Sequence, residues 1–418
     1  MMILRRIKNS WATPWQRMLY IMFVAQLMTG LGFSSIFPFL PLYVKSLGSA
    51  YGLNLDLLAG LVFSGQAFTM MITAPLWGQV ADRYGRKLMV ERSMFGGTII
   101  LLLMAFARSA EDLVILRAIQ GLITGTVAAT NALVAATAPR EHTGYAMGVI
   151  TVGMGAGVAL GPMMGGAIAD AYGYGAAFYV TSLMLFLAGV VVVLWVKEPD
   201  APRPVKAAAK VSVLSSWRGI FACPGVPAAY TMSFLNQLSR NMLLPVVPLF
   251  IPILMPGSHL INTFTGLITG IASATTTVSG IFLGRLGDRI GQRKVLIASL
   301  AAGGLVLIPQ GMVRNEWQLL ILQALMGVIA GGITPSISAL LARYTPHGAE
   351  GAVYGLDNSV GSGARSIAPM VGSAVMFSLG VRAPFAAAGA ALLFTALVAS
   401  LTLPRGNGCA QDTEQDAV

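Results

Sequence analysis

Long apolar stretches separated by short polar loops recur along the whole of this 418-residue chain. A helix needs about 20 apolar residues to cross a lipid bilayer, and twelve stretches reach that length. They lie near 16–44, 54–81, 88–107, 111–137, 142–170, 175–197, 225–254, 260–287, 293–313, 316–342, 350–378 and 382–403. The pattern predicts an all-α membrane protein with twelve transmembrane helices, of which the longest tilt or bend.

The second half of the chain repeats the motifs of the first. "GQVADRYGRK" at 78 returns as "GRLGDRIGQRK" at 284, and "ILRAIQG" at 115 returns as "ILQALMG" at 321, both at an offset of 206. "FPFLPLYV" at 37 returns as "LPVVPLFI" at 244, and Pro162 as Pro369, at an offset of 207. The repeat predicts two six-helix bundles that share one orientation and are related by a pseudo-twofold axis along the membrane normal.

The polar stretch "EPDAPRPVKAAAKVSVLSS" marks the boundary between the two halves. Its prolines and lysines suit an extended cytoplasmic linker. We therefore expect an N-terminal bundle over 1–197, a linker over 198–215, a C-terminal bundle over 216–403 and a tail over 404–418.

Composition and charge agree with a membrane location. Hydrophobic residues make up 56% of the chain and charged residues only 10%, whereas a soluble protein has about 25% charged residues. With the N-terminus inside, 20 of the 27 Lys and Arg fall on inner segments and four on outer loops. This bias accounts for the net charge of +11 without nucleic acid, and it places both termini in the cytoplasm of a multi-pass protein of the plasma or inner membrane. The first span is too long for a signal peptide.

The loop between the second and third spans concentrates charge in an otherwise apolar region. It contains Gly78, Asp82, Arg83, Gly85, Arg86 and Lys87, and its second copy contains Gly284, Asp288, Arg289 and Gly291. Gly78 allows a neighbouring helix to approach, Gly85 permits a sharp turn, and Asp82 suits the positive end of another helix. The cations can pair with acids of the other half or with anionic lipid. We expect a gating role, since positive-inside decoration alone does not explain two glycines and an acid at repeated positions.

"GxxxDRxGRK" resembles the signature loop of the major facilitator superfamily, and the twelve spans and duplicated halves match that family along the whole chain. In the family this loop latches the two halves together on the cytoplasmic side when the transporter opens outward. The second copy departs from the pattern, because Gln292 stands where the first copy has Arg86. We therefore expect the first copy to matter more.

The fifth span carries "GMGAGVALGPMMGG". Four glycines spaced four apart form one bare ridge that allows close helix packing, and Pro162 bends the helix. The motif residues are Gly153, Gly157, Gly161, Pro162, Gly165 and Gly166. "GxxxGPxxGG" resembles the motif of the antiporter branches of the superfamily, above all the twelve-span drug:proton antiporters, and favours export over import.

Arg117 is a cation within the fourth span, where an unpaired charge is costly. The matching position in the second half is Gln323, so the fold does not require the charge. "LRAIQG" resembles the fourth-span motif of the same antiporter branch, and this resemblance implies a role for Arg117 in proton coupling.

Other polar and aromatic residues interrupt the spans at a depth suited to a substrate cavity between the halves. They are Gln26, Phe33, Asn131, Gln237, Arg240 and Arg365. Asp357 is the one Asp or Glu inside an apolar run away from loops and turns. It can titrate as a coupling carboxylate, or it can pair with Arg83 or Arg86 in the cytoplasmic latch; the sequence leaves both open.

These features predict a secondary active transporter and not an enzyme. The chain has no phosphate-binding loop, its three histidines form no metal cluster, and Cys223 and Cys409 lie on the reducing side, so we expect no cofactor, metal or disulfide. It most resembles the MdtG-like multidrug efflux branch, which implies export of small amphiphilic molecules or drugs in exchange for protons by a monomer. An exporter of one metabolite, such as a sugar or organic anion, and a non-transporting membrane sensor are the alternatives.

Overall fold

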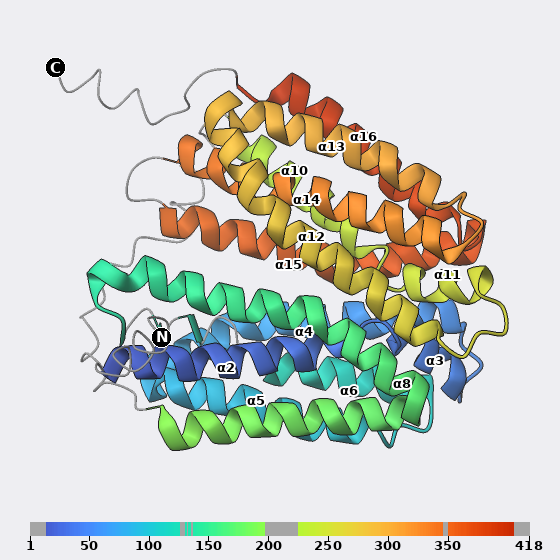
Figure 1. The fold of residues 1–418 in the computed structure, drawn as a ribbon, viewed down its shortest axis with the longest axis horizontal. Coiled ribbons are helices and arrows are strands. Elements are labelled where there is room, and N and C mark those ends of the chain that lie inside the picture. Colours follow the sequence, from blue (N-terminus) through green and yellow to red (C-terminus); the bar gives the residue numbers. More distant parts are fainter. Residues whose placement is uncertain are drawn as a thin grey trace, which may run out of the picture. The chain divides into compact units, whose positions relative to one another are not determined.

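The computed structural model describes residues 14–125, 130–131, 133–134, 137–196, 225–345 and 350–404, and all the regular structure in these residues is helical. The predicted linker lies outside them, as do both cysteines and the tail beyond Pro404. The all-α fold expected from the sequence is confirmed (Figure 1).

The helices of the first half follow the six predicted spans. They are α2 (Pro14–Ser35), α3 (Leu40–Leu47), α4 (Leu55–Tyr84), α5 (Arg86–Met104), α6 (Ala110–Ile123) and α8 (Thr143–Trp195), with a short 3-10 turn η1 (Arg140–His142) before α8. Helix α8 covers both the fifth and sixth spans. Gly173, at φ 84°, interrupts its helical backbone and separates the two.

The second half repeats this order of elements. It consists of α10 (Val226–Asn241), α11 (Val246–Leu254), α12 (Ile261–Ile290), α13 (Gln292–Gln310), α14 (Glu316–Tyr344), α15 (Glu350–Leu379) and α16 (Ala383–Thr402). The first and seventh spans are each broken in two, α2/α3 and α10/α11, at equivalent places. Pro38 and Pro245 lie in these breaks, where a residue without an N–H cannot extend the preceding helix.

Matching caps begin the fourth and tenth spans. Ser109 accepts from the Asp112 N–H at the start of α6, and the Asp112 carboxylate accepts from the Arg108 N–H. At the start of α14, Asn315 accepts from the Gln318 N–H, and the Gln318 side chain accepts from the Arg314 N–H. The offset is 206 again, so the repeat extends to the hydrogen bonds that begin a helix.

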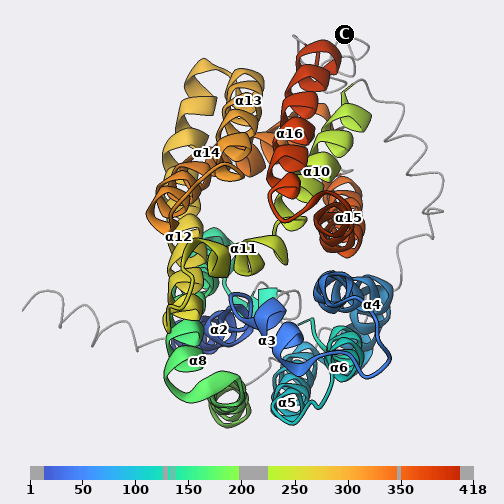
Figure 2. The same cartoon turned by 90° about the vertical axis from the view of Figure 1, so that its right-hand side faces the viewer.

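The chain packs into two compact units. Figure 2 views α5 and α6 of the first unit nearly along their axes. Unit 1 comprises residues 1–58, 68–206 and 259–270, and unit 2 comprises 59–67, 207–258 and 271–418. Two short segments therefore pack away from their own sequence half: part of α4 belongs to unit 2, and the first turns of α12 belong to unit 1.

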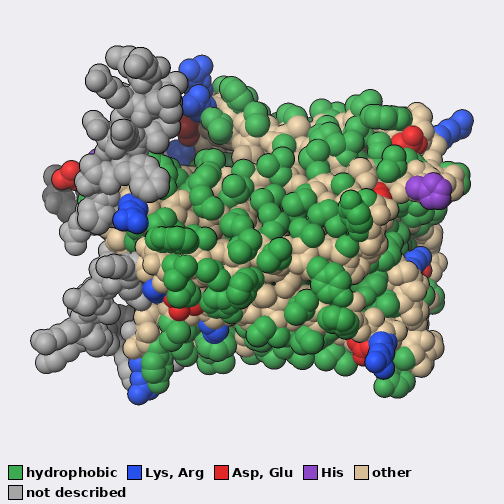
Figure 3. Space-filling view, turned by 60° about the horizontal axis from the view of Figure 1, so that its bottom comes forward, with side chains coloured by type: hydrophobic (Ala, Val, Ile, Leu, Met, Phe, Trp, Pro, Cys, Tyr) green, Lys and Arg blue, Asp and Glu red, His purple; other side chains and the backbone are tan. Residues whose placement is uncertain are grey.

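Apolar side chains cover the lengths of the helices, and charged side chains gather at their ends. Figure 3 shows this arrangement on one face. Eight of the described helical segments are long and apolar enough to cross a membrane, α8 among them. Exposed residues such as Leu305, Phe282 and Leu194 are therefore suited to contact lipid, which solvates them where water would not.

Candidate functional site

The glycines that close the two cytoplasmic loops adopt the backbone that the sequence requires of them. Gly85 between α4 and α5 has φ 101°, and Gly291 between α12 and α13 has φ 100°, a region that favours glycine. Gly78 and Gly284 behave differently. A Cβ added at either would meet nothing within 4 Å, so the close helix approach expected at Gly78 is not present in this structure.

Equivalent cations of the two loops, Lys87 and Arg293, bind the end of the last helix in their own half. Lys87 donates to the Val193 carbonyl (3.0 Å) near the C-terminus of α8 and lies 3.4 Å from Glu91. Arg293 donates to the Ser400 carbonyl (2.6 Å) near the C-terminus of α16. Lysine and arginine commonly satisfy such end carbonyls. In this structure Lys87 thus binds within its own bundle.

Other loop residues are exposed or only partly described. The Arg83 guanidinium lies 5.4 Å from the centre of the Tyr84 ring, and Asp288 and Arg289 are exposed. The Asp82 side chain lies outside the described part of the chain, so its expected contact with a helix end stays a prediction.

Gln292, the departure from the loop pattern, binds both its own loop and α14. Its amide donates to the Asp288 carboxylate (2.8 Å), and its carbonyl accepts from the Ser336 hydroxyl (3.0 Å). A neutral amide can do both at once because it carries a donor and an acceptor, whereas a guanidinium only donates. The second copy of the loop is therefore specialised rather than merely degenerate.

The glycine ridge of α8 packs directly on α2. A Cβ at Gly157 would lie 2.5 Å from the Leu27 carbonyl oxygen, and one at Gly161 or Gly165 would clash with Ser34 or Ser35. The Ser34 hydroxyl donates to the Gly157 carbonyl across this contact (3.2 Å). The spacing of four predicts the bare ridge, and the structure shows which helix fills it.

A second face of α8 packs on the start of α12. Gly266 of α12 lies against the Pro162 carbonyl, and Gly166 of α8 lies against the Asn262 carbonyl, each so closely that a Cβ would clash. Unit 2 contains the equivalent contact, where a Cβ at Gly60 of α4 would lie 2.7 Å from the Pro369 carbonyl oxygen of α15. In both units a glycine packs against the carbonyl of the proline inside the facing helix.

Arg117 is one of the largest fully buried side chains among the described residues, with 1% exposure. Its guanidinium donates to the Gln120 side chain one turn along α6 (2.7 Å). Gln323, the equivalent residue of α14, is only half-buried. The cation is thus placed deep inside unit 1 at a position where the second half leaves no charge.

A polar cluster joins α10 and α15 within unit 2. Asp357, Gly361 and Arg365 are four apart and share one face of α15. A Cβ at Gly361 would lie 3.4 Å from the Gln237 amide nitrogen and 3.7 Å from an Arg365 guanidinium nitrogen, so the missing side chain lets these two groups approach. Arg240 lies one turn from Gln237 on α10 and is exposed.

Asp357 lies at one end of this cluster. Its carboxylate is close enough to Tyr230 and Arg365 for electrostatic interaction. One of its oxygens is buried without a hydrogen-bond partner in the described structure. A carboxylate in this setting has an acceptor position open for a proton or for a donor group.

Gln26, Phe33 and Asn131 belong to unit 1. Gln26 on α2 is fully buried, and neither atom of its amide has a partner within the described structure. Phe33 is half-buried with its ring tip near Gly97 of α5, and Asn131 is half-buried. The six residues proposed for the substrate cavity are therefore split evenly, because Gln237, Arg240 and Arg365 belong to unit 2.

Sequence reasoning missed one polar contact in unit 1. The Arg92 guanidinium lies 3.3 Å from the centre of the Trp77 ring, and the Trp77 indole donates to the Leu122 carbonyl (2.6 Å). The contact joins α4, α5 and α6. The residues equivalent to Trp77 and Arg92 in the second half are Leu283 and Ala298. This difference between the halves could have identified the pair from the sequence.

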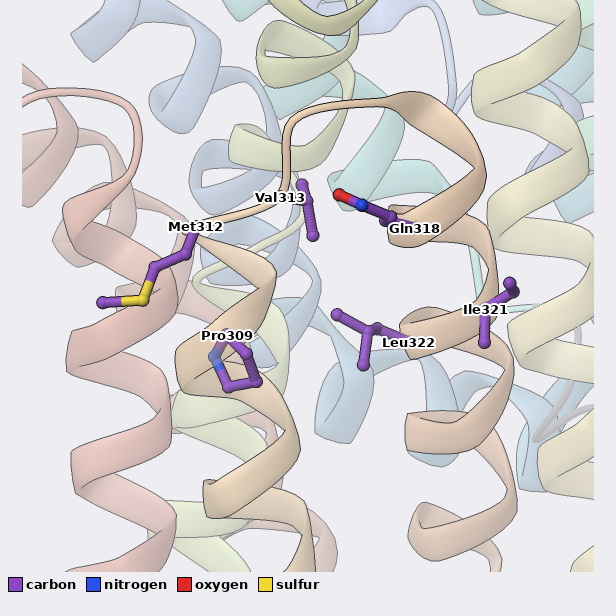
Figure 4. A pocket seen from close by; sticks show the side chains of 6 residues that line it. All are labelled: Pro309, Met312, Val313, Gln318, Ile321 and Leu322. Carbon is purple, nitrogen blue, oxygen red and sulfur yellow. The ribbon is translucent and has the colours of Figure 1, made fainter.

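A pocket of about 430 Å³ lies in unit 2 beside the joined ends of α13 and α14. Figure 4 shows its six lining residues, which are Pro309, Met312, Val313, Gln318, Ile321 and Leu322. Apart from Gln318 the lining is apolar. Met312 and Ile321 are among the strongly exposed hydrophobic residues, which suits contact with lipid.

Comparison with known families decides the class of protein. The profile of the Major Facilitator Superfamily matches the chain twice, over residues 22–233 and 229–414. The chain belongs to this superfamily. The two matches correspond to the two halves, and the superfamily fold predicted from the sequence is confirmed.

Curated relatives match over almost the full length. The Multidrug resistance protein MdtG of Enterobacter lignolyticus is 34% identical over 409 residues, covering 96% of each chain. MdtG of Serratia proteamaculans is 34% identical, covering 94% of this chain and 95% of its own. The predicted class, a secondary transporter of the MdtG-like branch, agrees with these findings.

Solved structures share the fold at low identity. The nucleoside transporter NupG matches with a TM-score of 0.77 and 12% identity, covering 94% of this chain and all of its own. The human organic anion transporter MFSD10 (TETRAN) matches with a TM-score of 0.63 and 20% identity, covering 93% of this chain and all of its own. They establish the architecture and say nothing of the substrate.

Proposed function

We propose that this transporter exports small amphiphilic molecules or drugs across the cell membrane in exchange for protons. The observation that carries the proposal is the similarity along 96% of the chain to proteins named for multidrug resistance. The "GxxxGPxxGG" motif supports export, because it resembles the antiporter motif and forms the tightly packed helix α8.

Coupling to protons rests on Arg117 and Asp357. A buried cation at a position that the fold does not require is suited to lower the proton affinity of nearby groups. Asp357 adds a carboxylate beside Arg365 and Tyr230, and a carboxylate whose surroundings alternate can take up and release a proton. Arg117 biases the proton path in this scheme, and Asp357 is the candidate carrier.

We propose that the substrate contacts Gln237, Arg240 and Arg365, which belong to unit 2, and Gln26, Phe33 and Asn131, which belong to unit 1. Two guanidiniums and the neighbouring amides are better suited to bind neutral, zwitterionic or anionic compounds than to bind cations. Fully buried Gln26, with no amide partner in the described structure, offers a donor and an acceptor.

We further propose a monomer with both termini in the cytoplasm and without enzymatic activity. The charge bias along the sequence supports this orientation. The ends of the helices that bear Gly85 and Gly291 then face the cytoplasm, and those near Gly173 and Gly257 face outward.

A specific metabolite exporter of the same fold is the second candidate, and the two guanidiniums of the cluster favour an organic anion among its substrates. Saturable flux of one compound class without broad resistance would support it. A non-transporting sensor would bind ligand in liposomes and give no flux.

The test is flux in proteoliposomes with an imposed pH gradient. Cationic, neutral and anionic compounds are compared, with a gradient-dissipating ionophore as the control. Accumulation of several chemically different compounds that collapses with the gradient supports drug:proton exchange. Flux that is indifferent to the gradient contradicts it.

A further inference from the structure

The carboxylate of Asp170, at the predicted outer end of the fifth span, binds the first turn of α12 within unit 1. One of its oxygens accepts from the Asn262 backbone N–H (3.2 Å) and from the Asn262 side chain (2.7 Å). The other accepts from the Thr263 backbone N–H (2.6 Å). Because α12 begins at Ile261, these amides are among those that the helix itself leaves without acceptors.

We propose that Asp170 is an outer latch, a positioning residue that holds the start of α12 on α8 in one state of the transport cycle and releases it in the other. The inference rests on the proposed function, since a contact that closes and opens matters only if access alternates. The family's signature loop concerns the cytoplasmic side, whereas Asp170 acts at the opposite ends of the helices.

The contact beneath Asp170 is made mainly by glycines that lie against backbone carbonyls. Gly166 and Gly266 lie against carbonyls of the facing helix, and a Cβ at Gly270 would lie 2.6 Å from the Ala159 carbonyl oxygen and 2.8 Å from the flexible side chain of Met163. Such a small-residue contact allows the two helices to approach closely and leaves few side chains to rearrange when they separate. The charge-assisted bonds of Asp170 supply a directional attachment at its end.

Aromatic residues hold the segment that carries Asp170. Tyr174 follows the interruption at Gly173 and hydrogen-bonds the Asn262 side chain. Its ring lies 5.2 Å from that of Tyr43 and 5.8 Å from that of Phe39. Asp170 is thus presented from a packed support rather than from a free loop.

The equivalent contact in unit 2 has no such residue. The start of α4, which belongs to unit 1, is capped by its own Asn54, whose side chain accepts from the Asp56 and Leu57 N–H groups. The residue equivalent to Asp170 is Phe377, which is 57% exposed. The glycine–proline packing therefore forms without an acid from the facing helix, and the fold alone does not explain Asp170.

The latch is tested by cysteine labelling in proteoliposomes, with Cys223 and Cys409 replaced by serine. The reporter is Thr265→Cys, because Thr265 is fully buried on α12 and its hydroxyl donates to the Ile261 carbonyl of its own helix. A membrane-impermeant maleimide is applied from the outer side. Asp170→Asn should raise the labelling rate about tenfold, the scale of a partly buried charge at a helix end.

Two further variants should give labelling rates between those of the parent and Asp170→Asn. A third variant tests whether the loss of any helix cap raises the labelling rate. Asn262→Ala removes only the side-chain bond and should raise labelling about two- to threefold. Asp170→Glu keeps the charge and should give a rate between those of the parent and Asp170→Asn. Asn54→Ala removes a helix cap that joins no second helix, and should leave the rate unchanged.

A labelling rate within about twofold of the parent in Asp170→Asn overturns the latch, as does an equal rise in Asn54→Ala. If Asp170→Asn does not fold, unchanged labelling in both Asn262→Ala and Asp170→Glu overturns it. Labelling is measured without substrate, so it is independent of flux. A parent that gives no flux but responds at Asp170 contradicts the proposed export and leaves the latch standing.

Discussion

The two halves of this transporter use the same devices to build a bundle and different residues in its interior. Each half closes its cytoplasmic loop with a left-handed glycine, Gly85 or Gly291. Each ties that loop to the end of its last helix through a cation, Lys87 or Arg293. The internal proline of each half also has its carbonyl packed against a glycine of the other half, Pro162 against Gly266 and Pro369 against Gly60.

The interior polar residues do not repeat. The residue equivalent to Arg117 in the other half is Gln323, and the residue equivalent to Arg240 is Phe33. The Arg92–Trp77 pair has Ala298 and Leu283 at the equivalent positions. A buried charge is costly in a membrane protein. The comparison teaches that positions shared by the halves serve the fold, whereas a costly residue found in one half only is a candidate for transport.

The glycine ridge should give the largest effect, because its contact is between backbones. Gly161→Ala introduces a Cβ that clashes with Ser34 and Leu31, so α8 and α2 must separate. We expect transport to fall by about tenfold or more, through the loss of tight packing. Gly148→Ala on the same helix is the matched control, since its Cβ would meet nothing within 4 Å. Equal flux in the two variants would refute the ridge.

Arg240 should give an intermediate effect on substrate. Arg240→Gln removes a cation that the first half replaces with Phe33, and the helix should remain intact. We expect about a three- to tenfold change in apparent affinity, the range of a single lost hydrogen bond, with coupling to the pH gradient retained. Arg314→Gln, an exposed loop cation outside the gating motif with the same change in net charge, should leave affinity unaltered. An identical change in apparent affinity in both variants would contradict the assignment of Arg240 to the substrate cavity.

The repeated caps should give the smallest effect, on stability rather than transport. Lys87→Met and Arg293→Met each remove hydrogen bonds to carbonyls at a helix end. Each should lower the free energy of unfolding by about 1 kcal/mol. Thermal unfolding in detergent measures this, with exposed Arg83→Met as the control. A fall in one half only would contradict the equivalence of the two caps.

The repeat made much of the fold predictable. The offset of 206 to 207 residues placed both loops and both helices with an internal proline, because proline and glycine act on the local backbone. The breaks within the first and seventh spans were not predicted. The bare ridge of α8 followed from its spacing of four. Its partner, α2, did not follow, since periodicity defines a face and not what covers it.

Polar contacts across the fold were the least predictable. Lys87 was expected to pair across the halves or with lipid, but its carbonyl partner is 106 residues away in its own bundle. The hydrogen bonds of Asp170 could not be predicted from the sequence, because their donors are 92 and 93 residues away. A charged residue near a helix end has many possible partners, and only tertiary packing selects one.

The most direct test of this account is the transport of Arg117→Gln, which copies the second half at Gln323. Gradient-driven accumulation and substrate counterflow are measured in the same liposomes. The account predicts normal protein yield and counterflow, with accumulation in response to the pH gradient lost. Accumulation at the parent level would contradict it. The buried cation of the first half would then be dispensable for coupling, just as Gln323 of the second half indicates that it is dispensable for the fold.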